Sequence, residues 1–198
     1  MADEAPLNPV TIVGKVPGGA LVPVAVDTDG NLQTEVVVTT PSQGYTVAVS
    51  ITRTADTNAY TANDVISAAT GSTAAQTFAL MGPSAGNIRI INAELEIDAA
   101  AVISGETNYR LHLYSVTPPS ALGDNAAWDL PSGDRASYLG FVELGTPVDL
   151  GSTLYVQSEP SKDVKLAGTS LFAYLVTIGA YTPASAQVYK ITLHSVAY

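Results

Sequence analysis

Short runs of β-branched and aromatic residues, each cut off by turn-forming residues, dominate this sequence and constrain its fold most. Val, Ile, Thr and Tyr fill the runs, and these side chains suit the pleated, half-buried surface of a β-strand. Clusters of Gly, Pro, Asn and Asp stand between the runs and predict turns. No apolar stripe with helical spacing extends beyond two turns. The pattern therefore predicts an all-β fold.

Segments with the composition of a strand occur along the whole chain. They are Val10–Val16, Leu21–Asp27, Leu32–Thr39, Tyr45–Thr54, Gln76–Leu80, Asn87–Ile97, Asn108–Tyr114, Ser137–Val142, Thr153–Val156, Ser170–Ile178 and Gln187–Ser195. Those from Tyr45 onward are sufficient for the roughly eight strands of a double-sheet jelly roll. We therefore expect a jelly-roll-like β-sandwich body over residues 44–198.

Residues 1–43 differ in character, because Pro and Gly interrupt them often and their strands are too few to enclose a core. The segment Val24–Val36 predicts a β-hairpin, in which Asp29-Gly30 supplies the positive φ angles of the turn. An isolated hairpin is only marginally stable in water. We expect an extended N-terminal arm that contacts its own body or a neighbouring subunit.

The strand Asn87–Ile97 has an unusual face, which begins with Ile88 and Ile90 and ends with Glu94 and Glu96. A change from apolar to acidic along one face indicates a strand that leaves the core, or a β-bulge that shifts the alternation.

Composition narrows the classes of partner. The 198 residues carry a formal net charge of −10, which argues against nucleic acid and against an anionic membrane surface. Charged residues are 13% of the chain, about half the usual share of roughly 25%. Weakly charged stretches such as Ala167–Gly179 would expose apolar surface on a monomer, which favours a homo-oligomer.

The first residues include Asp3 and Glu4 and lack a signal-peptide pattern, so we expect synthesis in a cytoplasm.

Residues that carry catalytic chemistry are scarce. The chain has no Cys, and its two histidines, His112 and His194, lie in separate strands without a partner at ligand spacing. Phosphate-binding loops, dinucleotide motifs and a nucleophile elbow are absent from the sequence. Glu94 and Glu96 share a face, as a glycosidase pair could, but such neighbours are commoner on solvated strands. We expect no enzyme, no cofactor, and no catalytic or metal-binding residue.

Two loop features leave alternatives open. Asp124, Asp129 and Asp134 lie in one loop and could gather around calcium, although Asp also forms turns. Asp27–Asn31 imitates the start of an EF-hand loop but lacks the acid at the twelfth position, so a turn is expected. Trp128 could stack on a sugar ring.

The run Ile51–Ile66 (ITRTADTNAYTANDVI) resembles an element of virion structural proteins of tailed bacteriophages. Further segments resemble the same proteins in the same order and extend the resemblance over roughly residues 45–145, namely Arg110–Tyr114, Pro118-Pro119, Asp124–Trp128 and Tyr138–Val142. The segment Val22–Leu32 is similar to hairpins that open several phage head and tail components. None of these motifs carries a catalytic residue.

The resemblance implies a β-sandwich virion subunit of the capsid decoration (cement) type. It implies binding to the major capsid protein, a homotrimer, and a place on the capsid exterior. Low charge agrees with this role, because interfaces avoid desolvating charged groups. A receptor- or glycan-binding module of a phage tail or head fibre stays open through Trp128 and the ten tyrosines. A polysaccharide lyase or hydrolase is disfavoured, because no acid/base constellation is visible.

Overall fold

The computed structural model describes residues 13–15, 21–23, 42–68 and 75–198, and in this part of the chain every regular element is a strand. The chain divides into two units, residues 1–40 and residues 41–198. In the first unit, β1 (Val13–Lys15) pairs antiparallel with β2 (Leu21–Pro23). The hairpin predicted over Val24–Val36 lies outside the described residues.

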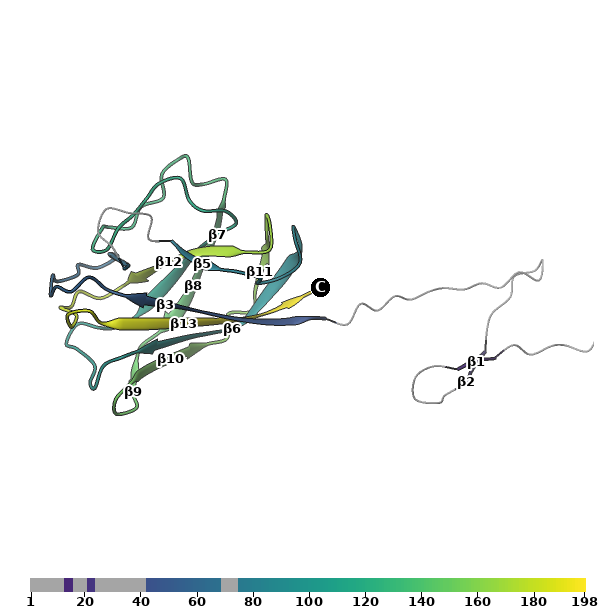
Figure 1. Cartoon of the computed structure of the whole chain (residues 1–198), viewed down its shortest axis with the longest axis horizontal. Coiled ribbons are helices and arrows are strands. Elements are labelled where there is room, and N and C mark those ends of the chain that lie inside the picture. The colour runs from purple at the N-terminus through teal and green to yellow at the C-terminus, as the bar shows by residue number, and fades with distance from the viewer. Residues whose placement is uncertain (1–12, 16–20, 24–41, 69–74) are drawn as a thin grey trace, which may run out of the picture. The chain divides into compact units, whose positions relative to one another are not determined.

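The second unit, the body, contains two antiparallel sheets (Figure 1). The first sheet has the order β3-β13-β6-β10-β9, with β11 also paired to β6; its strands are β3 (Gly44–Thr52), β6 (Asn87–Ile97), β9 (Val148–Asp149), β10 (Leu154–Ser158), β11 (Lys162–Lys165) and β13 (Val188–Ala197). The second has the order β4-β12-β7-β8, with β5 also paired to β12; its strands are β4 (Val65–Ile66), β5 (Gln76–Phe78), β7 (Tyr109–Tyr114), β8 (Tyr138–Gly145) and β12 (Leu171–Thr177).

The strand order is that of a jelly roll. When β4 counts with β5, β10 counts with β11, and the two-residue β9 is left aside, the body has eight strands in chain order. The first pairs with the last, the second with the seventh, the third with the sixth, and the fourth with the fifth. A long antiparallel ribbon rolled into two sheets gives this order, so the predicted all-β, jelly-roll-like sandwich is confirmed.

The core lies between the sheets and takes side chains from alternate positions of both. Its fully buried members include Ile51 of β3, Leu95 of β6, Leu111 of β7, Leu175 of β12 and Ile191 of β13. A second cluster lies on the other face of the β4-β12-β7-β8 sheet, under the connection between β7 and β8. Its buried members are Val65, Tyr114, Tyr174 and Val176.

The mixed face of β6 results from a β-bulge. Asn92 faces His194 of β13, whereas Ile90 faces Ser195, so Ile91 is an extra residue between them. Ile88 and Ile90 are buried before the bulge, and Ala93, Leu95 and Ile97 after it. The bulge therefore turns Glu94 and Glu96 away from the core, and the bulge alternative from the sequence is confirmed.

The expectation that Ala167–Gly179 would leave apolar surface exposed is wrong. Most of this stretch is β12, an inner strand of its sheet, and Leu171 and Ala173–Thr177 are buried. Both faces are covered, one by the core and the other by the second cluster, which explains a continuous apolar run. The short strands β4, β9 and β11 were not predicted, because runs of two to four residues give no periodic signal.

Candidate functional site

The run Ile51–Ile66 converges with the loop after β7 on one buried carboxylate, Asp124. Nη2 of Arg53 lies 3.0 Å from Oδ2 of Asp124, and these two side chains are 0% and 1% exposed. The Tyr60 hydroxyl donates to Oδ1 of Asp124 at 2.6 Å, and the backbone N–H of Ser67 donates to the same oxygen at 3.0 Å. We call Arg53, Tyr60, Ser67 and Asp124 the Asp124 network.

Two groups of the network, Arg53 and Tyr60, hold their protons firmly. The guanidinium of Arg53 lies 4.7 Å from the centre of the Tyr60 ring. Burial acts to lower the pKa of Arg53, but Tyr60 and Asp124 outweigh it and the pKa is raised. Burial, followed by the hydrogen bond to Asp124, raises the pKa of Tyr60 far above its ordinary value. Neither Arg53 nor Tyr60 releases a proton near neutral pH, and their bonds to Asp124 join the two segments.

The other acids of the same run shape its turns. Oδ1 of Asp56 accepts from Nη2 of Arg53 at 3.2 Å and from the N–H of Asn58 at 3.1 Å. Asp64 accepts from the N–H of Thr61 at 2.5 Å. The bond from Asn58 to Asp56 is typical of an Asx turn, and Asp64 bonds back to the N–H three residues before it. These motif residues thus define the loop between β3 and β4.

The three carboxylates considered for calcium do not converge. Asp124 is paired with Arg53, Asp134 accepts from the N–H of Ser120 at 3.3 Å, and Asp129 accepts from the neighbouring N–H of Leu130. Across the described ranges, no three His, Asp or Glu side chains are placed to hold a metal ion. Each carboxylate has a structural partner instead.

Trp128, which packs against the second cluster, also lies against His112. Their rings are stacked, with centroids 3.6 Å apart and an interplanar angle of 24°, and Nδ1 of His112 lies 2.9 Å from the Tyr138 hydroxyl. Burial, with a smaller contribution from Arg110, lowers the pKa of His112 to about 3. His112 is therefore neutral near pH 7. One face of the indole is covered by the imidazole, which leaves less of Trp128 for a sugar.

Of five tyrosines within strands, four are buried, namely Tyr109, Tyr114, Tyr174 and Tyr189, whereas Tyr155 of β10 is only partly buried. A chain of hydroxyl groups runs through the core from Glu106 through Tyr109, Tyr181 and Tyr189 to Gln187. Burial raises the pKa of each tyrosine in this chain. The hydroxyls remain protonated and satisfy one another inside the core.

Glu94 and Glu96 lie on the outer face of the first sheet, beside residues of β13. Oε2 of Glu96 is 2.5 Å from Nζ of Lys190, and Oε1 of Glu94 is 3.6 Å from Nε2 of His194. His194 also contacts the Thr46 hydroxyl, at 3.0 Å. These partly exposed groups pair across strands, as the solvated-strand interpretation predicts.

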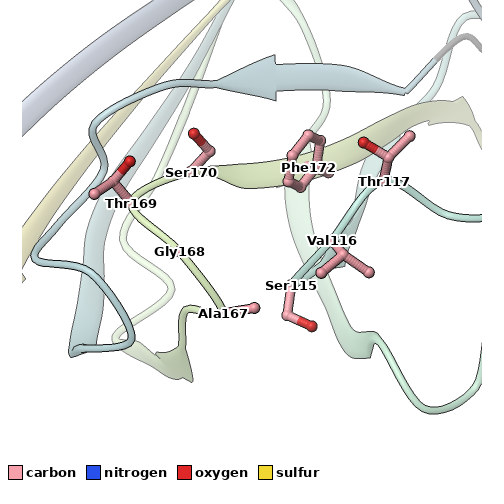
Figure 2. A pocket seen from close by; sticks show the side chains of 8 residues that line it. All are labelled: Ser115, Val116, Thr117, Ala167, Gly168, Thr169, Ser170 and Phe172. Carbon is pink, nitrogen blue, oxygen red and sulfur yellow. The ribbon is translucent and has the colours of Figure 1, made fainter.

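A shallow groove of about 610 Å³ lies between residues 115–117, after β7, and residues 167–172, which lead into β12 (Figure 2). Its lining consists of Ser115, Val116, Thr117, Ala167, Gly168, Thr169, Ser170 and Phe172. The lining combines hydroxyl groups with small apolar groups and carries no charge. It suits contact with another surface better than acid–base chemistry.

Sequence reasoning missed two of these features. Arg53 and Asp124 were both within quoted motifs, yet their pairing across 71 residues gave no local signal. The groove was missed because Ser and Thr are common throughout the chain.

The solved structures with some similarity to this chain include chains of virus particles. The chain matches no protein-family model and no curated protein sequence. A chain of the full particle of Israeli acute paralysis virus is 14% identical over 99% of this chain and 92% of its own length, with a TM-score of 0.27. A chain of the native virion of Kashmir bee virus is 14% identical over 98% and 92%, with a TM-score of 0.28. A chain of Desmodium yellow mottle tymovirus is 11% identical over 100% and 96%, with a TM-score of 0.24.

Similarities of this size do not establish a shared fold, so the jelly roll is assigned from the strand pairing of this chain itself. A search of the described residues for a helix long and apolar enough to cross a membrane finds none.

Proposed function

We propose that the protein is a non-enzymatic virion structural protein, and more narrowly a capsid decoration (cement) protein of a tailed bacteriophage. The observation that carries the proposal is that the charged residues of the phage-like motif form bonds within the body. These residues, Arg53, Asp56 and Asp64, and the more distant Asp124 are engaged in holding the body together. The resemblance is thus one of architecture, and the body is a jelly roll, an architecture that also serves viral capsids.

The proposed partner is the lattice of the major capsid protein, which this chain binds and stabilises on the outside of the capsid. The chain also associates with itself, and the threefold number follows from the resemblance. Residues 1–43 are proposed as an assembly arm that contacts neighbouring subunits or the capsid surface. The uncharged groove of Figure 2 is the kind of surface that such contacts use.

Add-back to stripped particles tests this function. Particles freed of the protein are incubated with the full chain or with a chain that lacks residues 1–43, and bound protein is measured after sedimentation. We expect the full chain to bind and to raise the temperature at which the particles open. The truncated chain should keep its β-type circular dichroism spectrum but lose binding. Failure of the full chain to bind contradicts the cement role, and full binding by the truncated chain contradicts the arm.

A glycan-binding module is the second candidate, favoured by aromatic groups on the outer side of the β4-β12-β7-β8 sheet. Phe141 is 44% exposed, and the guanidinium of Arg110 lies 4.3 Å from the centre of its ring. Trp128 is partly buried nearby, stacked on His112. A glycan array compares the unmodified chain with the Phe141→Ala variant. Binding that Phe141→Ala abolishes would favour this candidate over the cement role.

A further inference from the structure

The strand β3 forms one edge of the first sheet and is paired on one side only. All nine residues, Gly44–Thr52, pair in continuous antiparallel register with β13. Within the described part of the chain, no strand pairs with the other side of β3. A nine-residue strand therefore presents one row of backbone groups for pairing.

Hydrogen bonds at both ends of the ladder fix which residues face the open side. The N–H of Arg53 donates to the carbonyl of Gln187 at 3.0 Å, and the N–H of Ala197 donates to the carbonyl of Gln43 at 2.9 Å. Both pairs continue the register of β3 with β13, so odd-numbered residues of β3 bond to β13. In an antiparallel ladder, alternate residues point their backbone groups to opposite sides. The N–H and C=O groups of Gly44, Thr46, Ala48, Ser50 and Thr52 therefore point to the open edge.

This edge lacks the features that usually prevent strand addition. Its sequence, GYTVAVSIT, contains no charged residue and no Pro, and the pairing with β13 has no bulge. The edge strand of the second sheet, β8, differs, because its pairing with β7 has two irregularities and it carries Glu143. Exposed edges in monomeric proteins are normally protected by charge, Pro or bulges. In a chain of net charge −10, an uncharged strip lets the edges of two copies meet without placing like charges face to face.

We propose that β3 pairs antiparallel with β3 of a second copy, with Ala48 facing Ala48 across a twofold axis. In this register Thr46 faces Ser50 and Gly44 faces Thr52, so every residue with free backbone groups meets another. Each such pair can exchange two N–H···O bonds. The two body sheets then continue as one sheet across the axis.

The side chains are also self-complementary in this register. The exposed residues that meet on the outer face are small, namely Thr46 with Ser50 and Ala48 with itself. On the inner face Val47 meets Val49, and both are half-buried in one copy. No charged group is desolvated. A second copy therefore fits the edge, because its backbone groups can bond, its side chains are small enough to meet, and it brings no charge.

The contact is twofold, so it forms a dimer or joins two larger oligomers, and a threefold contact would need another surface. The inference rests on the edge of β3 and not on the proposed virion role. It is tested on the isolated full chain, whereas the virion role is tested on particles, and the two can fail separately.

Single cysteines test the register, because the chain has no Cys of its own. In Ala48→Cys the two Cα atoms would be about 5.5 Å apart, within the usual range for a disulfide. In Ser50→Cys the two copies of position 50 would lie four residues apart along the strand, about 13 Å, which is too far. Under mild oxidation we expect a covalent dimer from Ala48→Cys, little from Ser50→Cys, and dimer again from the double variant Thr46→Cys/Ser50→Cys.

Ala48→Lys tests the energetics, because it places two charges face to face at the axis. We expect sedimentation equilibrium to show at least a tenfold weaker self-association than for the unmodified chain. Gln157→Lys, an exposed position on β10 of the same sheet, adds the same charge away from the edge and should leave association unchanged. The proposal is overturned if the unmodified chain remains a monomer of 20.4 kDa at all concentrations. It is also overturned if Ser50→Cys cross-links as well as Ala48→Cys, or if Ala48→Lys associates as tightly as Gln157→Lys.

Discussion

At the scale of single residues, burial separates two ion pairs with the same chemistry. Arg53 and Asp124 are almost inaccessible to solvent, whereas the side chains of Arg89 and Asp163 are each 49% exposed. Water stabilises the charges of the exposed pair when one partner is removed. Removing a buried partner leaves a charge in the interior without compensation.

Asp124→Ala should therefore destabilise the body by about 3–5 kcal/mol, because the Tyr60 hydroxyl and the Ser67 N–H lose this acceptor and Arg53 loses its buried charged partner. The matched variant Asp163→Ala should cost much less, because water stabilises the exposed Arg89 when its partner is removed. Urea unfolding of both variants measures the difference. Equal costs would show that the Asp124 network does not hold the loops together.

His112 gives a dependence of stability on pH. Burial, with Arg110, lowers its pKa from 6.5 to about 3 in the folded chain, so below pH 6.5 the unfolded chain binds a proton that the folded chain does not. Stability should fall as the pH decreases from 6.5, by up to about 1.4 kcal/mol per pH unit for this group. His112→Phe retains an aromatic ring against Trp128 and should reduce the loss between pH 6.5 and 4.5. An unchanged slope in urea titrations would contradict the assignment.

At the scale of elements, two turns approach so closely that only Gly fits. A Cβ added to Gly179, after β12, would overlap the carbonyl oxygen of Gly105 and crowd the hydroxyl of Thr107. Gly105 has a φ of +92°, which a larger residue adopts only with strain. This contact fixes the loop that carries Tyr181 into the core.

Gly179→Ala should cost about 3 kcal/mol, the upper end of the usual range for overpacking. Gly133→Ala is the control, since nothing lies within 4 Å of a Cβ at that position. Thermal unfolding followed by circular dichroism compares the two variants. A melting temperature for Gly179→Ala equal to that of Gly133→Ala would show that the turns can separate.

Elements were predictable from the sequence where a local pattern determines them. The bounds of β6 followed from its pattern of residues, and its mixed face indicated either a bulge or a strand that leaves the core. The pairing with β13 decides for the bulge, in which one residue out of phase moves the later side chains to the other face. The burial of β12 on both faces was not predictable, since it depends on the distant connection between β7 and β8. The partner of Arg53 was hidden for the same reason: its acid lies 71 residues away.

At the scale of the whole molecule, low charge and the jelly-roll body fit a protein that acts through its surfaces. Arg53, Asp56 and Asp64 form hydrogen bonds within the body, and the groove of Figure 2 carries no charge. The class of fold could be derived from strand and turn patterns. The virion role could not, because a fold does not determine a function and the resemblance carried that step.

The most direct measurement of the central claim is the position of this chain in an intact particle, determined by cryo-electron microscopy of virions that contain it. The cement role predicts density for the jelly-roll body repeated over the outer surface of the capsid lattice, in contact with the major capsid protein. Density confined to a single vertex, a tail or a fibre, with the capsid lattice bare, would contradict it.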